Sequence, residues 1–235
     1  MPKALLAITS YNGKFYDDGT KTGVFVVEAL HPYEVLVKNG FEVDFVSHTG
    51  SFGWDEHSLA PDFLSAEEKA IIEDPNSPFM KGMNLAKKPE DVNAADYDIF
   101  FASAGHGSCF DYPKSEGLHK LVAEIYANNK VVGAVCHAPV IFDGLKDVNG
   151  NLLIKGKKIT GFTDEGEEIL GLVKIMERDN VKTVQKVAED NGATYVQPEG
   201  PWGSFAVVDG RLVTGVNPAS AVETTEKCIE TLKQL

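Results

Sequence analysis

The sequence predicts an α/β protein with a largely parallel sheet that is covered by helices on both faces. The first observation behind this prediction is that short apolar runs rich in β-branched residues alternate with segments of helical period. The second is that no composition shift, low-complexity tract or internal repeat divides the 235 residues. We therefore expect one α/β domain over residues 1–235.

The apolar runs mark the expected strands, and the segments between them mark the expected helices. In 117–128, for example, apolar residues recur with the i, i+3, i+4, i+7 spacing of an amphipathic helix, and Asn217-Pro218 opens a last helix near the end of the chain. The expected strands are Ala4–Ser10, Phe41–Ser47, Asp98–Ala104, Val131–Val135, Lys158–Phe162, Phe205–Val208 and Leu212–Thr214.

Two regions interrupt the alternation of strands and helices. Residues 50–93 contain much Gly, Pro, Asp and Lys and only weak helix patterns, which predicts an insertion over the sheet edge that serves as a lid or a dimer contact. Residues Val148–Lys158, with Asn149-Gly150 at their centre, predict a small β-hairpin.

Charge and cysteine content limit the classes of partner and the compartment. The net charge is −13, and the few Lys and Arg residues are scattered, so nucleic acid and anionic membranes are not expected partners. No apolar run approaches the roughly 20 residues that span a bilayer. Three widely spaced cysteines fit reduced thiols in a cytoplasmic protein, for which the nucleus is a second possible compartment.

Cys136 is the strongest candidate for a catalytic nucleophile. It ends a buried strand in the segment KVVGAVCHAPVIF and is followed by a histidine and by Pro139, a residue that suits the first turn of a helix. The amino terminus of that helix would stabilise a thiolate at an accessible surface turn. The alternative is a cysteine that is simply packed in the core.

Strand ends elsewhere in the chain supply candidate partners for this thiol. His137 is adjacent, and the segment GFTDEGEE offers Glu167 and Glu168 to orient it, although these acids also suit a solvated helix start. The turn SAGHG offers the backbone amides of Gly105 and His106 to a developing oxyanion, unless it is only a tight turn.

Glu28 is a carboxylate within the apolar segment VFVVEALHP. Burial there would raise its pKa, and a neutral carboxyl could donate a hydrogen bond to a thiolate. A glutamate on an ordinary amphipathic helix is the alternative.

These motifs together resemble the ThiJ/PfpI superfamily, specifically its fungal branch of glutathione-independent glyoxalases (glyoxalase III), also described as heat-shock chaperones. The likeness runs almost end to end, from LLAITSYN to GRLVTGVNPASA, and includes AVCHAP, FVVEALHP, SAGHG and ITGFTDEGEE. It implies a flavodoxin-like sandwich of the class I glutamine amidotransferase type, usually a homodimer. It also implies that Cys136 is the nucleophile, His137 its partner, Glu28 the helix glutamate, and Glu167 the third acid, with Glu168 as the neighbouring alternative.

The resemblance implies a lyase of the D-lactate dehydratase type. Such an enzyme converts methylglyoxal or glyoxal with water to D-lactate or glycolate through a hemithioacetal on Cys136, without glutathione, a metal or an organic cofactor. The partner is then a small dicarbonyl substrate. Two alternatives stay open: a stress-induced holdase chaperone or redox sensor, and another cysteine hydrolase such as an amidase or deglycase.

Overall fold

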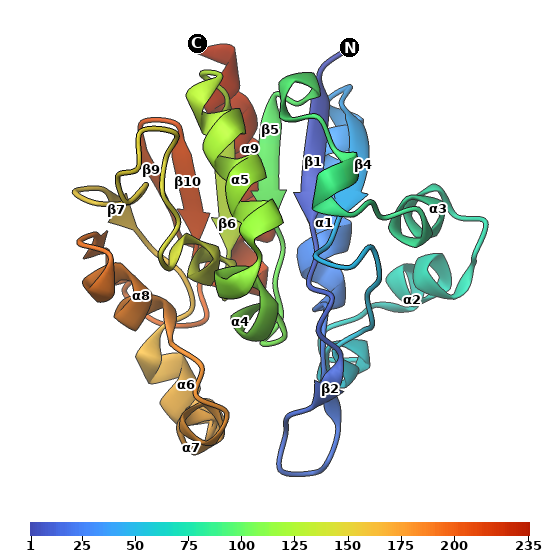
Figure 1. Ribbon diagram of the computed structural model, residues 1–235. Helices are drawn as coiled ribbons and strands as arrows, with labels where there is room; N and C mark the ends of the chain where they lie inside the picture. The colour runs from blue at the N-terminus through green and yellow to red at the C-terminus, as the bar shows by residue number, and fades with distance from the viewer.

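A six-stranded sheet forms the centre of the protein in the computed structural model, which describes residues 1–235 (Figure 1). The strand order β4-β1-β5-β6-β10 is parallel throughout, and β9 adds an antiparallel edge. Numbered along the chain, the parallel strands have the order 2-1-3-4-5 of a flavodoxin-like sheet, as predicted. The bounds are β1 Lys3–Ala7, β4 Glu42–Val46, β5 Ile99–Ala102, β6 Val131–Val135, β10 Leu212–Gly215 and β9 Ala206–Asp209.

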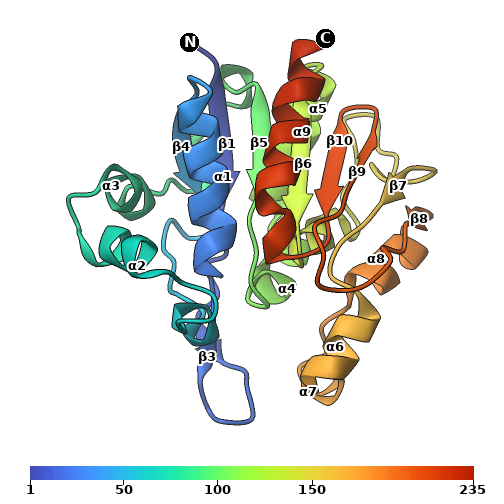
Figure 2. The ribbon, with the colours of Figure 1, turned by 180° about the vertical axis from the view of Figure 1, so that it is seen from behind.

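Helices cover both faces of this sheet, which confirms the predicted layers. Helices α1 (Val26–Lys38) and α9 (Ala221–Lys233) lie side by side on one face (Figure 2). Helices α4 (Ser108–Asp111) and α5 (Glu116–Ala127) lie on the other face (Figure 1). The central strands β5 and β6 are buried along their whole length, which explains their continuous apolar sequence.

The predicted strand Lys158–Phe162 is shorter and lies outside the main sheet. Strand β7 spans only Lys158–Ile159 and pairs with β8 (Thr194–Tyr195) in a separate two-stranded sheet. The chain then leaves the strand because the Thr160 amide donates to the Thr214 hydroxyl and the Phe162 amide donates to the Cys136 carbonyl. Phe162 is thereby carried to the end of β6.

Residues 50–93 form two short helices and three-residue or four-residue turns beside the β4 edge. Helix α3 (Pro78–Asn84) contacts β4, and α2 (Ala66–Glu73) packs on α3 (Figure 1). The single turns in and after this region are η1 (Glu56–Leu59), η2 (Pro89–Asp91) and η3 (Ala94–Asp96).

The predicted hairpin at Val148–Lys158 is wrong. Only one isolated antiparallel bridge forms, between Lys146 and Leu152. The Asp147 side chain accepts hydrogen bonds from the amides of Asn149 and Asn151, which closes a compact turn in place of two paired strands.

The loops at the carboxyl edge of the sheet carry the remaining elements. The hairpin β2–β3 and the helices α6 and α7 extend beyond this edge on either side (Figure 1). No helix of the structure has the length and apolar character needed to cross a membrane. The bounds are β2 Gly13–Lys14, β3 Lys21–Thr22, η4 Tyr112–Lys114, η5 Ala138–Phe142, α6 Asp164–Leu170, α7 Val173–Arg178, α8 Val184–Asp190 and η6 Pro218–Ser220.

Candidate active site

Cys136 lies on a sharp turn directly after β6. Its backbone φ is +60°, in the left-handed region that a residue with a Cβ enters at a cost of about 1–3 kcal/mol. Two hydrogen bonds hold this conformation: the Cys136 amide donates to the Gly215 carbonyl at 2.9 Å, and the Phe162 amide donates to the Cys136 carbonyl at 2.8 Å. Such a turn aims the side chain away from the sheet edge, as in nucleophile elbows.

The surroundings of the thiol differ from the predicted accessible turn. The expected helix is the short 3₁₀ turn η5, and Cys136 is only 3% exposed. Burial, and next the negative charge that Glu28 has when it is ionised, raise the pKa of the Cys136 thiol well above its ordinary value, while the His137 backbone amide acts in the opposite direction. The predicted accessible turn at the start of a helix is therefore wrong, because the thiol is buried and only a 3₁₀ turn follows it. A proton acceptor is needed.

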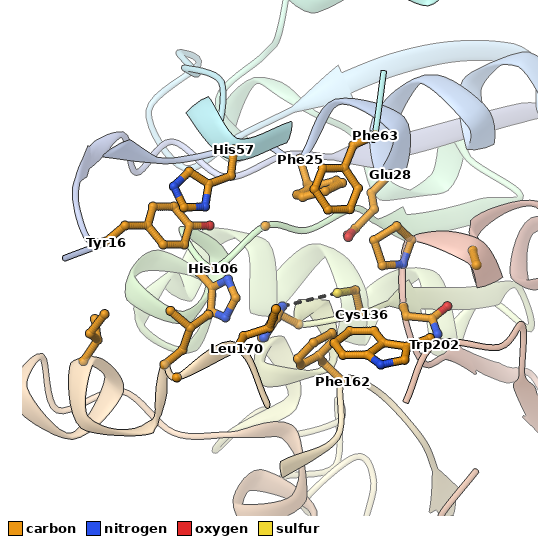
Figure 3. A pocket seen from close by; sticks show the side chains of 18 of the residues that line it. Tyr16, Phe25, Glu28, His57, Phe63, His106, Cys136, Phe162, Leu170 and Trp202 are labelled. Atoms are coloured by element: carbon orange, nitrogen blue, oxygen red, sulfur yellow. Dashed lines mark hydrogen bonds between the residues drawn. The ribbon is translucent and has the colours of Figure 1, made fainter. Parts of the chain in front are cut away.

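His137 lies in position to be that acceptor. Its Nδ1 is 3.3 Å from the Cys136 Sγ (Figure 3), and its Nε2 is 2.5 Å from Oε1 of Glu167. A carboxylate can only accept, so the Nε2–H donates to Glu167 and the Nδ1 lone pair faces the thiol. Burial, and next His106, lower the pKa of His137, whereas Glu167 acts in the opposite direction.

Helix α6 brings Glu167, and not Glu168, to this histidine. The Thr163 hydroxyl accepts from the Gly166 amide and fixes the start of the helix. Glu167 is 1% exposed, whereas the next residue, Glu168, points to solvent. Burial would raise the pKa of Glu167, but the charges and hydrogen bonds of His106 and His137 outweigh burial, and the pKa is lowered.

The ring of His106 is a member of this cluster that sequence reasoning missed. Its Nε2 donates to Oε2 of Glu167 at 3.0 Å, and its ring centroid is 3.8 Å from that of His137. Its Nδ1 has no hydrogen-bond partner in the protein. The sequence favoured this residue only for its backbone amide, because nothing in a Gly-His-Gly turn indicates where the ring points.

The turn after β5 leaves backbone amides unpaired. Gly105 has φ +132°, and a Cβ there would lie 2.0 Å from the Gly23 carbonyl oxygen, so only glycine fits. The amides of Gly105 and His106 donate to no acceptor in the protein. The His137 backbone amide acts to lower the pKa of the Cys136 thiol and is a third candidate donor, which the sequence prediction did not include.

Glu28 approaches the thiol from the first turn of α1. Its side chain is completely buried, its carboxyl points toward Cys136, and neither oxygen makes a hydrogen bond of good geometry (Figure 3). Burial raises the pKa of Glu28 to about 8, and the Cys136 thiol and the Ala104 backbone only partly offset this effect. The carboxyl is thus largely neutral at pH 7 and able to donate.

These groups open into a pocket of about 590 Å³. Its walls include Phe25 and Phe63 on the side of Glu28, and Phe162 and Trp202 on the opposite side (Figure 3). Phe63 belongs to the 50–93 segment, which therefore contributes to the pocket. Sequence reasoning did not find these aromatic walls, because they come from separate loops that share no motif.

His106, His137 and Glu167 also have the composition of a metal-binding set. Their ligand atoms lie within 4.8 Å of one another, and all three residues are buried. Both histidine Nε2 atoms already bind the carboxylate in this structure. The arrangement is equally that of a hydrogen-bonded catalytic triad with an additional histidine.

Comparison with known proteins identifies the family. The model of the DJ-1/PfpI family matches residues 20–231. The chain belongs to the DJ-1/PfpI family. Relatives include the glutathione-independent glyoxalase HSP31 of Saccharomyces cerevisiae, 59% identical over 98% of both chains, and Glyoxalase 3 of Candida albicans, 57% identical over 97% of this chain and 98% of its own.

The fold and the family predicted from the sequence are thus both confirmed. A crystal structure of glyoxalase III from Candida albicans superimposes with a TM-score of 0.95 at 57% identity, covering 98% of this chain and 97% of its own. In this DJ-1/PfpI protein, one pocket is lined by five of the predicted site residues: Glu28, Gly105, His106, Cys136 and His137. Glu167 does not line the pocket and lies behind the two histidines.

Proposed function

We propose that Cys136 gives this glutathione-independent glyoxalase the internal thiol that replaces glutathione, and that the products are D-lactate from methylglyoxal and glycolate from glyoxal. Alignment with two fungal glyoxalases over nearly the full length of the chain, at 57% and 59% identity, supports the activity. One observation carries the mechanism: the Cys136 thiol lies 3.3 Å from a histidine nitrogen whose lone pair is directed at it by a buried carboxylate.

The first step is addition of the thiol to the aldehyde carbon. The S–H proton passes to His137 Nδ1, and Glu167 stabilises the imidazolium from the other side. Neutral Glu28 donates a hydrogen bond to the sulfur and, having no charge of its own, does not repel the negative charge on the thiolate. As the S–C bond forms, the aldehyde oxygen gains negative charge, and the amides of Gly105, His106 and His137 donate hydrogen bonds to it until it is protonated.

The second step moves hydrogen between the two substrate carbons. A base removes the C1 proton from the hemithioacetal, the resulting enediol is protonated at C2, and a thioester of lactate remains on Cys136. C1 is oxidised and C2 is reduced, so no external electron carrier is needed. Water then cleaves the C–S bond and returns the thiol, and the product is the hydroxy acid.

We infer that two histidines share this proton traffic. The Nδ1 of His137 faces the Cys136 sulfur, so it exchanges a proton with the thiol. The ring of His106 lines the same pocket, and its Nδ1 has no protein partner and can exchange a proton with the substrate. His106 can therefore protonate or deprotonate the second oxygen or C2 while Glu167 compensates its charge. No metal or organic cofactor is required, and turnover should survive exhaustive treatment with a chelator.

The decisive experiment is turnover of methylglyoxal by the purified protein without added thiol, compared with Cys136→Ala. Loss of turnover with an unchanged circular dichroism spectrum is expected. A Cys136→Ala rate within about tenfold of wild type would contradict the assignment of Cys136 as the nucleophile. A protein that is silent toward methylglyoxal but suppresses aggregation of a client would favour the holdase alternative, and release of ammonia from amides would favour the hydrolase.

Two further properties complete the proposal. A homodimer is proposed from the superfamily resemblance, and light scattering of the purified chain tests it. A cytoplasmic location, with the nucleus as a second compartment, is proposed because all three cysteines are free and buried. Fractionation or imaging of a tagged chain tests the location.

A further inference from the structure

Asp55 is a buried carboxylate that the proposed reaction does not use. It lies at the start of the turn η1 and is completely buried. The hydroxyls of Tyr16 and Thr22 each donate to its Oδ2 at 2.7 Å, and the Ser58 amide donates to its Oδ1 at 3.1 Å. All three donors are uncharged, although a buried carboxylate with only neutral partners is costly to keep. Asp55 therefore fastens the hairpin β2–β3 to the 50–93 segment.

Thr22 connects Asp55 to the turn that offers the oxyanion amides. Its hydroxyl gives its single proton to Asp55, so its lone pairs are free to accept. One of them accepts from the Gly107 amide at 3.1 Å, and Thr22 is completely buried. This bond fixes the peptide that follows His106, next to the free amides of Gly105 and His106. Asp55 thus orients the hydroxyl that orients the turn.

Ser58 connects Asp55 to helix α1. Its hydroxyl donates to the Asp55 carbonyl at 2.6 Å and accepts from the amide of Val26, the first residue of α1, at 3.2 Å. Glu28 lies in the same first turn of this helix. The position of the Glu28 carboxyl beside the thiol therefore depends on a cap that Asp55 holds at both the amide and the hydroxyl of Ser58.

Asp55 also acts on the pocket through Tyr16 and through its charge. The Tyr16 ring lines the pocket, stacks on His57 with ring centroids 3.6 Å apart, and meets His106 edge-on at 6.3 Å (Figure 3). Burial raises the pKa of Glu28 to about 8, and the negative charge of Asp55 adds to this effect.

We propose that Asp55 is a positioning residue for the proposed reaction: through Thr22 it holds the turn that presents the oxyanion amides, and through Ser58 it holds the first turn of α1. This inference rests on the proposed glyoxalase function and adds a residue that does not line the pocket. Amides at an oxyanion site donate most strongly to charge that develops in the transition state. Their displacement should therefore lower kcat and leave KM nearly unchanged.

Variants of Thr22 test the hydroxyl link. Thr22→Val has nearly the same shape without the hydroxyl and should lower kcat for methylglyoxal about 10-fold to 100-fold, with KM within about threefold of wild type. Thr22→Ser restores a donor and acceptor and should keep kcat within about threefold of wild type. Thr225→Val is the matched control, since the Thr225 hydroxyl is equally buried but donates to Ala221 within α9, and its kcat should be unchanged. Circular dichroism and urea unfolding of each variant detect any loss of the fold.

Asp55→Asn removes the charge and keeps the size. It should lower kcat at least as much as Thr22→Val, and it should also lower the pKa of Glu28, which Thr22→Val should leave unchanged. NMR of the glutamate carboxyl carbons follows this titration, with the Glu28 resonance identified by its loss in Glu28→Gln. Cys136, the other ionisable group that acts on Glu28, is present in all these variants. Asp98→Asn is the control and should change neither quantity, because Asp98 accepts its hydrogen bonds at the opposite end of the sheet.

The outcomes separate this inference from the function on which it rests. A wild-type protein that turns over methylglyoxal, together with Thr22→Val or Asp55→Asn at the wild-type kcat, overturns the positioning role and leaves the glyoxalase intact. An equal loss in Thr22→Ser or Thr225→Val, or a loss confined to KM, overturns it as well, and these Thr variants decide the matter if Asp55→Asn does not fold. An unchanged Glu28 pKa in folded Asp55→Asn overturns the action of the charge. Silence of the wild-type protein toward methylglyoxal overturns the function and this inference together.

Discussion

Replacing Glu28 with glutamine tests whether the buried carboxyl is neutral in the folded protein. Glutamine keeps the size and a donor group but cannot ionise. In the folded wild-type protein, burial raises the pKa of the Glu28 carboxyl from 4.5 to about 8, whereas the Glu28→Gln variant has no ionisable group at this position. The two proteins should therefore differ in how their stability depends on pH.

The sign follows from proton linkage. Below pH 4.5 the carboxyl is neutral in both the folded and the unfolded chain and costs nothing extra. Between pH 4.5 and 8 the unfolded chain releases the proton while the folded chain retains it, so the free energy of unfolding falls as pH rises. At 1.36 kcal/mol for each pH unit, this loss is about 3 kcal/mol by pH 7 and about 5 kcal/mol above pH 8.

Urea unfolding of the wild-type and variant proteins at pH values from 4.5 to 8.5 measures this difference. The stability of Glu28→Gln relative to wild type should rise by about 3 kcal/mol between pH 4.5 and 7, while the exposed control Glu168→Gln should show no such trend. Parallel curves for wild type and Glu28→Gln would refute the assignment of a neutral acid. In the activity assay, Glu28→Leu, which removes the donor, should lose more than Glu28→Gln.

Three other predictions concern the groups around the thiol. Glu167→Gln should lower kcat/KM at least about 100-fold by releasing the histidine tautomer, whereas Glu168→Gln should stay within about twofold; similar losses in the two variants would contradict the assignment. His106→Gln keeps a donor to Glu167 but removes the titratable nitrogen, so kcat should fall more than KM rises and the pH profile should change shape; an unchanged profile argues against proton transfer. Graded peroxide should add oxygen to Cys136 before the other two cysteines, which do not line the pocket, and peptide mass spectrometry showing another order would contradict this.

The sequence predicted those site residues that follow strands. Cys136 follows β6 and Gly105 follows β5, and carboxyl ends of parallel strands meet at one edge of the sheet whatever the loops do. The choice between Glu167 and Glu168 needed the structure, because neighbouring helix positions point about 100° apart and either could face inward. The Thr163 cap decides which of them does.

The rest of the site depends on contacts that local sequence does not encode. The His106 ring reaches Glu167, 61 positions along the chain. The two acids lie on helices α1 and α6, and they reach the thiol and the histidines only through the packing of these helices against the rest of the protein. The aromatic walls come from irregular segments, where neither the helical nor the strand period applies and side-chain direction is therefore unpredictable. The Cys136 surroundings were misjudged for the same reason: a turn at a sheet edge is exposed only if no other segment covers it.

The two carboxyl groups of the site show why that cover matters. Both are buried, yet the pKa of Glu167 is lowered, since two histidines donate to it, and the pKa of Glu28 is raised to about 8, since burial is not balanced by a donor. Opposite shifts in neighbouring acids mark opposite roles. Glu167 is the permanent anion that lets His137 accept the thiol proton, and Glu28 is the neutral donor that lets the sulfur carry the charge left behind. An exposed turn could supply neither, because water would bring both acids back to their ordinary pKa.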